Sequence, residues 1–214
     1  RPYADFAILY RTNAQSRVLE ERFMKDGIPY RIFSGTKFYE RMEIKDMLAY
    51  LRLVHNPADR ISFARVVNVP KRGIGKGSSD KILEYAEEQG MPVLESLAEA
   101  PYIPGLQARA VNTLNSFYQM MLKFQEEASK GGPVAELTEL ILKETGYMAA
   151  LRAENTVEAE ARIENLNEFL SVTAEYDNNM EAYLQDPGLE EEQNRLILGG
   201  FLEQVSLVAE IDNF

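Results

Sequence analysis

The sequence predicts a mainly α-helical fold that begins with a short α/β unit. From Glu40 onward, apolar residues recur three or four positions apart, which is the period of an amphipathic helix. Before Glu40, two short apolar runs flank one helical pattern, as in a strand–helix–strand unit. A turn rich in glycine and lysine, residues 69–79, joins two of the helical patterns. Together these features divide the chain into residues 1–39, 40–200 and a final helix at 201–214.

Residues 1–39 are expected to form a βαβ unit. The run at 6–10, Phe-Ala-Ile-Leu-Tyr, is continuously apolar, as is typical of a strand buried on both faces of a parallel sheet. Asn13 stands where a helix N-cap belongs, ahead of a helical pattern at 14–24, and residues 30–33 are expected to form the second strand. Because two strands cannot complete a sheet, we expect this unit to belong to a larger α/β domain. The chain is therefore interpreted as a fragment of a longer protein.

The second region is expected to form a succession of helices separated by clear breaks. Glycine, proline and asparagine mark those breaks, because they end or interrupt helices. The expected breaks are at Asn56-Pro57, at the glycine-rich turn, and at 101–104, 130–133 and 185–188. Ile61, Ala64 and Val67 indicate a short helix before the turn, and the helix after it is expected to be capped by Ser78 or Ser79.

Charge is unevenly distributed along the chain. The net charge is −11, yet residues 1–81 hold 16 Lys and Arg against 9 Asp and Glu, and residues 82–214 hold 7 against 25. The first part therefore carries +7 and the second −18. We interpret the basic part as a working face, since cations near phosphates supply most non-specific affinity for nucleic acids. The acidic part, including a helix expected at 156–172, is interpreted mostly as solvated helix surface.

Composition excludes several function classes. The chain contains no Cys, which excludes disulfides, thiol nucleophiles and Cys-ligated zinc and fits a cytoplasmic protein. The single His55 cannot build a His-rich metal site, and the sequence contains no nucleotide-binding phosphate loop. No apolar run approaches the length of a membrane span. We therefore assign no catalytic residue and no metal ligand, and we expect a cytoplasmic protein that does not contact membranes.

The turn at 69–79 is the strongest candidate for a binding site. Its glycines permit positive φ and let backbone N–H groups approach an anion closely, and the following helix adds free N–H groups and the positive end of its dipole. Lys71, Arg72 and Lys76 surround the glycines, so we expect phosphates to bind here. The Gly-hydrophobic-Gly-Lys pattern is similar to a helix-hairpin-helix DNA-binding turn, which holds phosphates without reading bases. An ordinary helix–helix loop with glycine as a C-cap is the alternative.

Arg11, Asn13 and Lys37 form a second candidate set. Each follows an expected strand, which places all three near the carboxyl edge where open α/β sheets bind ligands. The alternatives are a surface cation for Arg11 and a helix cap for Asn13. Phe38 and Tyr39 could stack on bases, although their helical setting favours packing in the core.

Three blocks of the sequence resemble a known family. They read AILYRTNAQSR at 7–17, FYERMEIKDMLAYLR at 38–52 and NVPKRGIG at 68–75. In this order and at this spacing they are similar to signatures of UvrD/Rep/PcrA-type superfamily 1 DNA helicases. A weaker match, EARIENLNEF at 160–169, extends the resemblance across most of the chain.

The resemblance implies an architecture and an activity. Residues 1–39 would be part of the second RecA-like motor domain, 40–200 the inserted all-helical 2B-like subdomain, and 201–214 a helix returning toward the motor domain. Helicases of this family move 3′ to 5′ on single-stranded DNA by hydrolysing ATP, in processes such as DNA repair and DNA replication. ATP and Mg²⁺ are implied for the whole helicase. Its ATP-site residues fall mostly outside this sequence, so we expect the fragment alone to be inactive.

The resemblance also implies DNA contacts. Arg11, Asn13 and Lys37 match positions near the single-strand track. The positions that match the turn touching the duplex backbone are Lys71, Arg72, Gly73, Ile74, Gly75, Lys76 and Ser78. We therefore expect a monomer that binds a single-strand/duplex junction and regulates unwinding. The alternative is a protein-interaction or autoinhibitory module that docks partners through its acidic helices and makes little contact with DNA.

Overall fold

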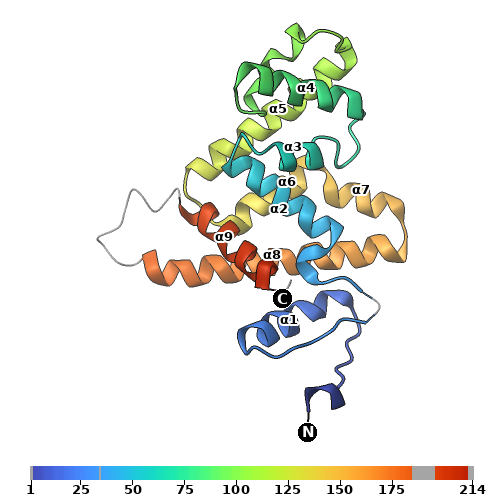
Figure 1. Ribbon diagram of the computed structural model, residues 1–214, viewed down its shortest axis with the longest axis vertical. Coiled ribbons are helices and arrows are strands. Elements are labelled where there is room, and N and C mark those ends of the chain that lie inside the picture. Colours follow the sequence, from blue (N-terminus) through green and yellow to red (C-terminus); the bar gives the residue numbers. More distant parts are fainter. Residues whose placement is uncertain (1, 34, 185–195, 212–214) are drawn as a thin grey trace.

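The computed structural model describes residues 2–33, 35–184 and 196–211, and the regular elements within them are helices (Figure 1). The α-helices are α1 (Ser16–Lys25), α2 (Met42–His55), α3 (Arg60–Val66), α4 (Lys76–Gln89), α5 (Ala108–Ser129), α6 (Val134–Thr145), α7 (Tyr147–Glu154), α8 (Val157–Leu184) and α9 (Leu196–Ile211). Short 3-10 segments are η1 (Tyr3–Asp5), η2 (Asn13–Gln15), η3 (Phe38–Glu40) and η4 (Glu95–Tyr102). The molecule is elongated, with α1 at one end and α4 at the other (Figure 1).

The prediction of an α/β unit at residues 1–39 was wrong. The described part of this region contains helix α1 but no strand, and it therefore forms no βαβ unit of RecA-like type. Phe6 has extended backbone angles, yet Leu9 is 95% exposed and Phe33 is 84% exposed. A strand is stabilised by hydrogen bonds to neighbouring strands, and two short strands without further partners are too weak to form a sheet. The mainly helical class expected for the remainder is confirmed.

Helix α2 forms the centre of the core. It contacts α3, α5, α6, α8 and α9, and Figure 1 shows these helices around it. Its side chains at Ile44, Tyr50 and Leu51 are fully buried, because a helix surrounded by other helices is apolar on most of its faces. The helix ends at His55, as the Asn56-Pro57 break predicts. Phe38 and Tyr39, just before α2, are also buried, which confirms core packing rather than an exposed stacking surface.

Helix α3 is the short helix that Ile61, Ala64 and Val67 indicate, although only Val67 of these three is buried. Ile61 is 85% exposed and Ala64 is also exposed, whereas Phe63 and Val66 are fully buried. The Asp59 carboxylate caps the helix by accepting a hydrogen bond from the Ser62 N–H at 2.9 Å. This cap starts the helix at Arg60 and so determines which positions of a seven-residue helix face α2.

The long helix α8 links the two ends of the sequence. Its Leu166 and Phe169 are fully buried, and Phe169 packs edge-on against Phe201 of α9, with ring centroids 6.0 Å apart. Asp177 of α8 accepts hydrogen bonds from the first two N–H groups of α6, at 2.9 and 2.8 Å. The helix extends well beyond the expected 156–172, and the turn predicted at 185–188 lies outside the described residues.

No helix in the described ranges is both long and apolar enough to cross a membrane. The same residues contain no group of three or more His, Cys, Asp or Glu side chains arranged to hold a metal ion.

Candidate nucleic-acid interface

The candidate turn connects α3 to α4. Helix α4 begins at Lys76, earlier than expected. Gly75 is the N-cap of α4, so the prediction of Ser78 or Ser79 as the cap was wrong. Both serine N–H groups instead bond to the Gly75 carbonyl oxygen, at 3.0 and 3.2 Å. Lys76 and Gly77 therefore occupy the first helical positions, where N–H groups have no acceptor within the helix.

Asn68 shapes the inner side of the turn. Its side-chain oxygen accepts hydrogen bonds from the N–H of Arg72 at 2.7 Å and from the N–H of Ile74 at 3.2 Å. The Ile74 side chain is only 2% exposed and belongs to the hydrophobic core. Two N–H groups of the expected anion-binding segment therefore bond to the protein itself, and the buried Ile74 side chain anchors the turn in the core.

The Arg72 side chain lies along the backbone rather than pointing out into solvent. Its Nη2 donates to the Tyr50 hydroxyl at 2.7 Å, and its guanidinium carbon lies 5.3 Å from the ring centroid of Phe117. Its Nη1 donates to four backbone carbonyl oxygens, those of Val66 (3.1 Å), Val67 (3.4 Å), Val69 (2.9 Å) and Pro70 (3.3 Å). Burial raises the pKa of Tyr50 to about 12, so its hydroxyl remains protonated at neutral pH.

The outer side of the turn is open. Lys71, Gly73, Gly75, Lys76 and Gly77 are all exposed. A Cβ atom added at any of the three glycines would meet no atom within 4 Å, so nothing in the protein blocks an approaching group there. Gly73 has φ +81°, a backbone conformation that residues other than glycine rarely adopt. The turn therefore presents two lysines and uncrowded backbone on one side and a tightly bonded scaffold on the other.

The second candidate set lies near α1, away from this turn. Arg11 and Asn13 are exposed and Lys37 is half-buried. Figure 1 shows α2 between the α1 end and the α3–α4 turn, so the structure does not bring the two sets together. The prediction of Asn13 as an N-cap was wrong, because Thr12 precedes η2 and the Gln15 side chain accepts hydrogen bonds from the N–H groups of Arg11 (2.9 Å) and Thr12 (3.4 Å).

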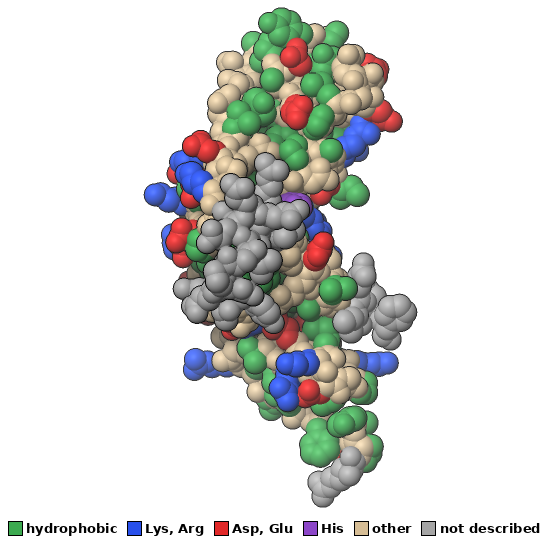
Figure 2. Space-filling view, turned by 90° about the vertical axis from the view of Figure 1, so that its left-hand side faces the viewer, with side chains coloured by type: hydrophobic (Ala, Val, Ile, Leu, Met, Phe, Trp, Pro, Cys, Tyr) green, Lys and Arg blue, Asp and Glu red, His purple; other side chains and the backbone are tan. Residues whose placement is uncertain are grey.

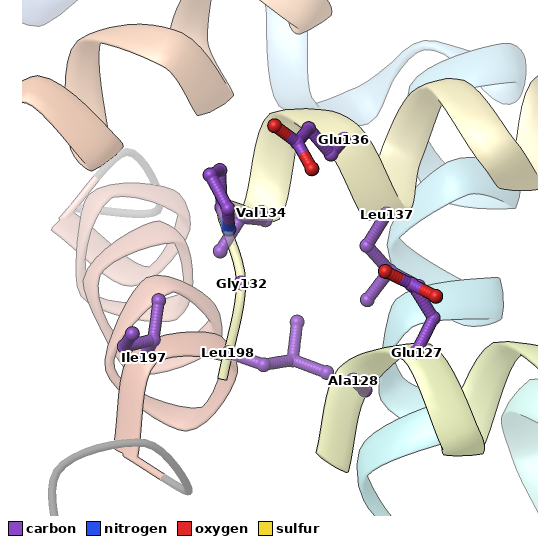
Figure 3. A pocket seen from close by; sticks show the side chains of 9 residues that line it. Glu127, Ala128, Gly132, Val134, Glu136, Leu137, Ile197 and Leu198 are labelled. Carbon is purple, nitrogen blue, oxygen red and sulfur yellow. The ribbon is translucent and has the colours of Figure 1, made fainter. Parts of the chain in front are cut away.

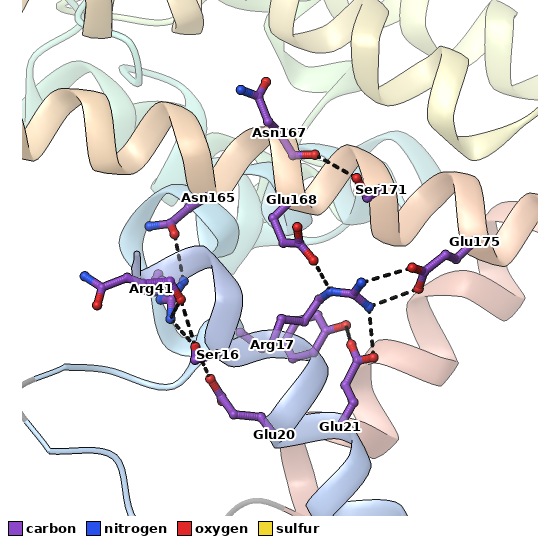
Figure 4. A network of polar contacts seen from close by, with 12 residues as sticks. Ser16, Arg17, Glu20, Glu21, Arg41, Asn165, Asn167, Glu168, Ser171 and Glu175 are labelled. Carbon is purple, nitrogen blue, oxygen red and sulfur yellow. Dashed lines mark hydrogen bonds and ion pairs between the residues drawn. The ribbon is translucent and has the colours of Figure 1, made fainter. Parts of the chain in front are cut away.

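Sequence reasoning missed an ionic network between α1 and α8 that is centred on a buried arginine (Figure 4). The Arg17 side chain is 5% exposed and bonds to Glu168 at 2.6 Å, to both oxygens of Glu175 at 3.0 Å, and to Glu21 at 3.0 Å. Burial alone would lower the pKa of Arg17, but the bonds to Glu175 and Glu168 raise it. The i, i+4 spacing of Arg17 and Glu21 was the one available signal in the sequence.

A second buried cation completes the same connection. Arg41 donates to the Asn165 side-chain oxygen at 2.7 Å, to the Ser16 hydroxyl at 2.7 Å, and to the Asn13 carbonyl oxygen at 2.9 Å. Burial lowers the pKa of Arg41, and Glu20 is the first of the nearby carboxylates that oppose this shift. These contacts tie the segment around η2 to α8, and they are structural rather than accessible to a ligand.

Two hollows on the described part of the surface do not resemble ligand sites. The first lies between α5, α6 and α9, is lined by Val134, Leu137 and Leu198 among others, and has a volume of about 10 Å³, room for roughly one water molecule (Figure 3). The second is an open groove of about 470 Å³ between α2 and α9, lined by residues of both charges such as Arg52 and Glu203. On the face in Figure 2, basic and acidic side chains are interspersed, with several basic ones around the α1 end.

In comparisons with known proteins, this chain is similar to DNA helicases. The family model described as "UvrD-like helicase C-terminal domain" matches residues 1–213. The chain is 46% identical to the ATP-dependent DNA helicase PcrA of Bacillus subtilis (strain 168), 44% to that of Staphylococcus epidermidis (strain ATCC 12228 / FDA PCI 1200) and 43% to that of Staphylococcus aureus (strain NCTC 8325 / PS 47). Each alignment covers 99% of this chain and 27% of the relative, so the chain spans about 27% of the length of these proteins.

Proposed function

Because this chain belongs to the UvrD-like helicase C-terminal domain family, we propose that it is a segment of an ATP-dependent 3′–5′ DNA helicase. Its α3–α4 turn holds the backbone of duplex DNA next to the point of strand separation. ATP and Mg²⁺ serve the whole helicase, whose ATP site lies mostly in other parts of that protein. Within it, residues 1–39 belong to the motor domain and 40–200 to the inserted helical subdomain.

The observation that carries the duplex contact is the outer side of the turn. Lys71 and Lys76 are exposed, and the N–H groups of Lys76 and Gly77 lie at the start of α4. Backbone N–H groups at a helix start bind phosphate oxygens, and lysines add long-range attraction. Because such contacts read no base edges, binding is independent of sequence and weakens with salt.

The test is a salt titration with a fluorescently labelled duplex that carries a 3′ single-stranded tail. Lys71→Ala combined with Lys76→Ala removes two phosphate contacts, so the slope of log K against log[salt] becomes shallower by about 1.8 for duplex DNA. The matched control is Lys123→Ala with Lys143→Ala, which removes the same charge from exposed positions on α5 and α6. Equal effects of the two double variants would show that only net charge matters and would rule out a site at the turn.

Arg11, Asn13 and Lys37 contact the single strand in the same proposal. Arg11 and Asn13 are exposed, as such a role needs, and all three lie near α1 rather than at the duplex turn.

A protein-interaction role is the second candidate, supported by the charge of −18 on residues 82–214. Part of that charge is used internally, since Glu168 and Glu175 bind Arg17. A pull-down with and without nuclease separates the two functions, because partners held through DNA are lost when the DNA is digested.

A further inference from the structure

The three cations of the α3–α4 turn make different contacts. Lys71 and Lys76 are exposed, whereas Arg72 is half-buried. The two N–H groups on Nη1 of Arg72 are shared among four backbone carbonyl oxygens, and Nη2 donates to the hydroxyl of Tyr50. Its flat face covers the ring of Phe117. Both terminal nitrogens of this cation therefore bond to its own protein rather than pointing freely toward an external phosphate.

Tyr50 binds the Arg72 side chain from the core side of the turn. It belongs to α2 and is fully buried, so DNA cannot reach it. Its hydroxyl accepts the hydrogen bond from Arg72 and donates to the carbonyl oxygen of Val69. A buried hydroxyl with both a donor and an acceptor partner is fixed in orientation. The backbone between α3 and the glycines is thus bonded to the central helix through one tyrosine and one arginine.

We propose that Arg72 and Tyr50 are positioning residues for duplex binding and that neither touches the DNA. They hold the backbone from Val66 to Pro70 against α2, and this fixes the direction in which the glycines and lysines of the turn face. The inference rests on the proposed function, since it explains how the same turn is shaped. Arg72 then acts by holding the turn in position, and it does not make the direct phosphate contact that its sequence position suggests.

The chemistry of the site requires arginine in particular. The carbonyls accept from Nη1 and the Tyr50 hydroxyl accepts from Nη2, so the two terminal nitrogens of one planar guanidinium serve both at once. A lysine ammonium keeps the positive charge but has three donors on one atom, so it cannot bridge the same groups. Replacing Arg72 by lysine therefore keeps the positive charge while it removes the donor arrangement, so the two contributions can be measured separately.

The experiment measures junction binding and its salt dependence for Tyr50→Phe, Arg72→Lys and Arg72→Met, with the labelled tailed duplex as the probe. We expect Tyr50→Phe and Arg72→Lys each to weaken binding about fivefold to tenfold, the size of one lost intramolecular hydrogen bond. Combining them should cost little more than either alone, because they break the same connection. In all three variants the salt slope stays at the wild-type value, since no phosphate contact is lost.

A measurement without DNA checks the same idea. The amide resonances of Gly73, Gly75 and Gly77 should shift in Tyr50→Phe and Arg72→Lys, and should stay in place in Lys71→Ala. Thermal unfolding of each variant identifies any that fail to fold. If Arg72→Met does not fold, the test uses Arg72→Lys and Tyr50→Phe.

Two results would overturn the positioning role. One is wild-type binding by both Tyr50→Phe and Arg72→Lys, and the other is a slope that becomes shallower by about 0.9 in Arg72→Met, which marks a phosphate contact. Failure of the proposed function appears differently. In that case the wild-type chain does not bind the junction, or Lys71→Ala with Lys76→Ala matches its lysine control.

Discussion

At the scale of single residues, three buried or half-buried arginines bond extensively to their own protein. Arg17, Arg41 and Arg72 are each surrounded by oxygen acceptors, whereas Lys71 and Lys76 are exposed. Composition alone treats all five as one basic patch. Which of them face solvent is decided by neighbours that are distant in sequence, such as Glu168 and Glu175 for Arg17.

Arg17→Met should destabilise the chain through its ion pairs. Removing the guanidinium leaves Glu21, Glu168 and Glu175 close together without their cation, and breaking a buried pair costs several kcal/mol. Because Glu175 is 60% exposed and water can solvate it, we expect a loss of about 2 kcal/mol in the free energy of unfolding, measured in urea.

Arg22→Met is the control for this variant. It removes a cation of the same helix whose side chain is 67% exposed and paired with Asp26, so the expected cost is below about 1 kcal/mol. Equal losses for the two variants would contradict the view that burial decides the strength of the α1–α8 connection.

At the scale of elements, the turn between α3 and α4 combines two kinds of glycine. Gly73 has φ +81°, and Gly77 lies within α4 with open space around it. Gly73→Ala should lower the free energy of unfolding by about 1 kcal/mol, because alanine is strained at positive φ. Gly77→Ala should raise it by up to about 1 kcal/mol, because alanine is the better helix former. Urea unfolding measures both changes.

Gly77→Ala is also the internal control, since it adds the same methyl group four positions away. Two changes of the same sign would show that the turn tolerates positive φ without glycine, or that α4 begins later than Lys76.

The elements themselves were predicted unevenly. The end of α2 at Asn56-Pro57 was correct because proline interrupts a helix regardless of its surroundings. The cap of α4 was misplaced, because Gly75 adopts the N-cap conformation while serine is the better cap by side-chain chemistry. The sequence indicated α3 but not the face that it buries, since its seven residues are too few to show a period. Short elements depend on their neighbours more than on their own pattern.

At the scale of the whole molecule, the two proposed DNA contacts lie in different regions, with α2 between them (Figure 1). Arg11→Ala should therefore weaken binding to single-stranded DNA and make the salt slope shallower by about 0.7, the value for one lost single-strand phosphate contact. Binding to a blunt duplex should stay unchanged, because that DNA uses the α3–α4 turn. Fluorescence anisotropy with the two probes measures both.

The control for Arg11→Ala is Arg22→Ala, which removes an exposed cation of α1. An equal loss of affinity for single strand and blunt duplex would contradict separate sites for the two forms of DNA.

The sequence by itself determined the helical class of residues 40–184, the end of α2, the core packing of Phe38 and Tyr39, and the family resemblance. These features depend on local periodicity, on proline chemistry, or on contiguous residue patterns. Only the tertiary structure decided that residues 6–10 and 30–33 form no sheet and that Arg72 turns inward onto Tyr50. The physical reason is the same in both cases. Strand pairing and the burial of a cation depend on partners elsewhere in the chain, and no local pattern shows whether those partners are present.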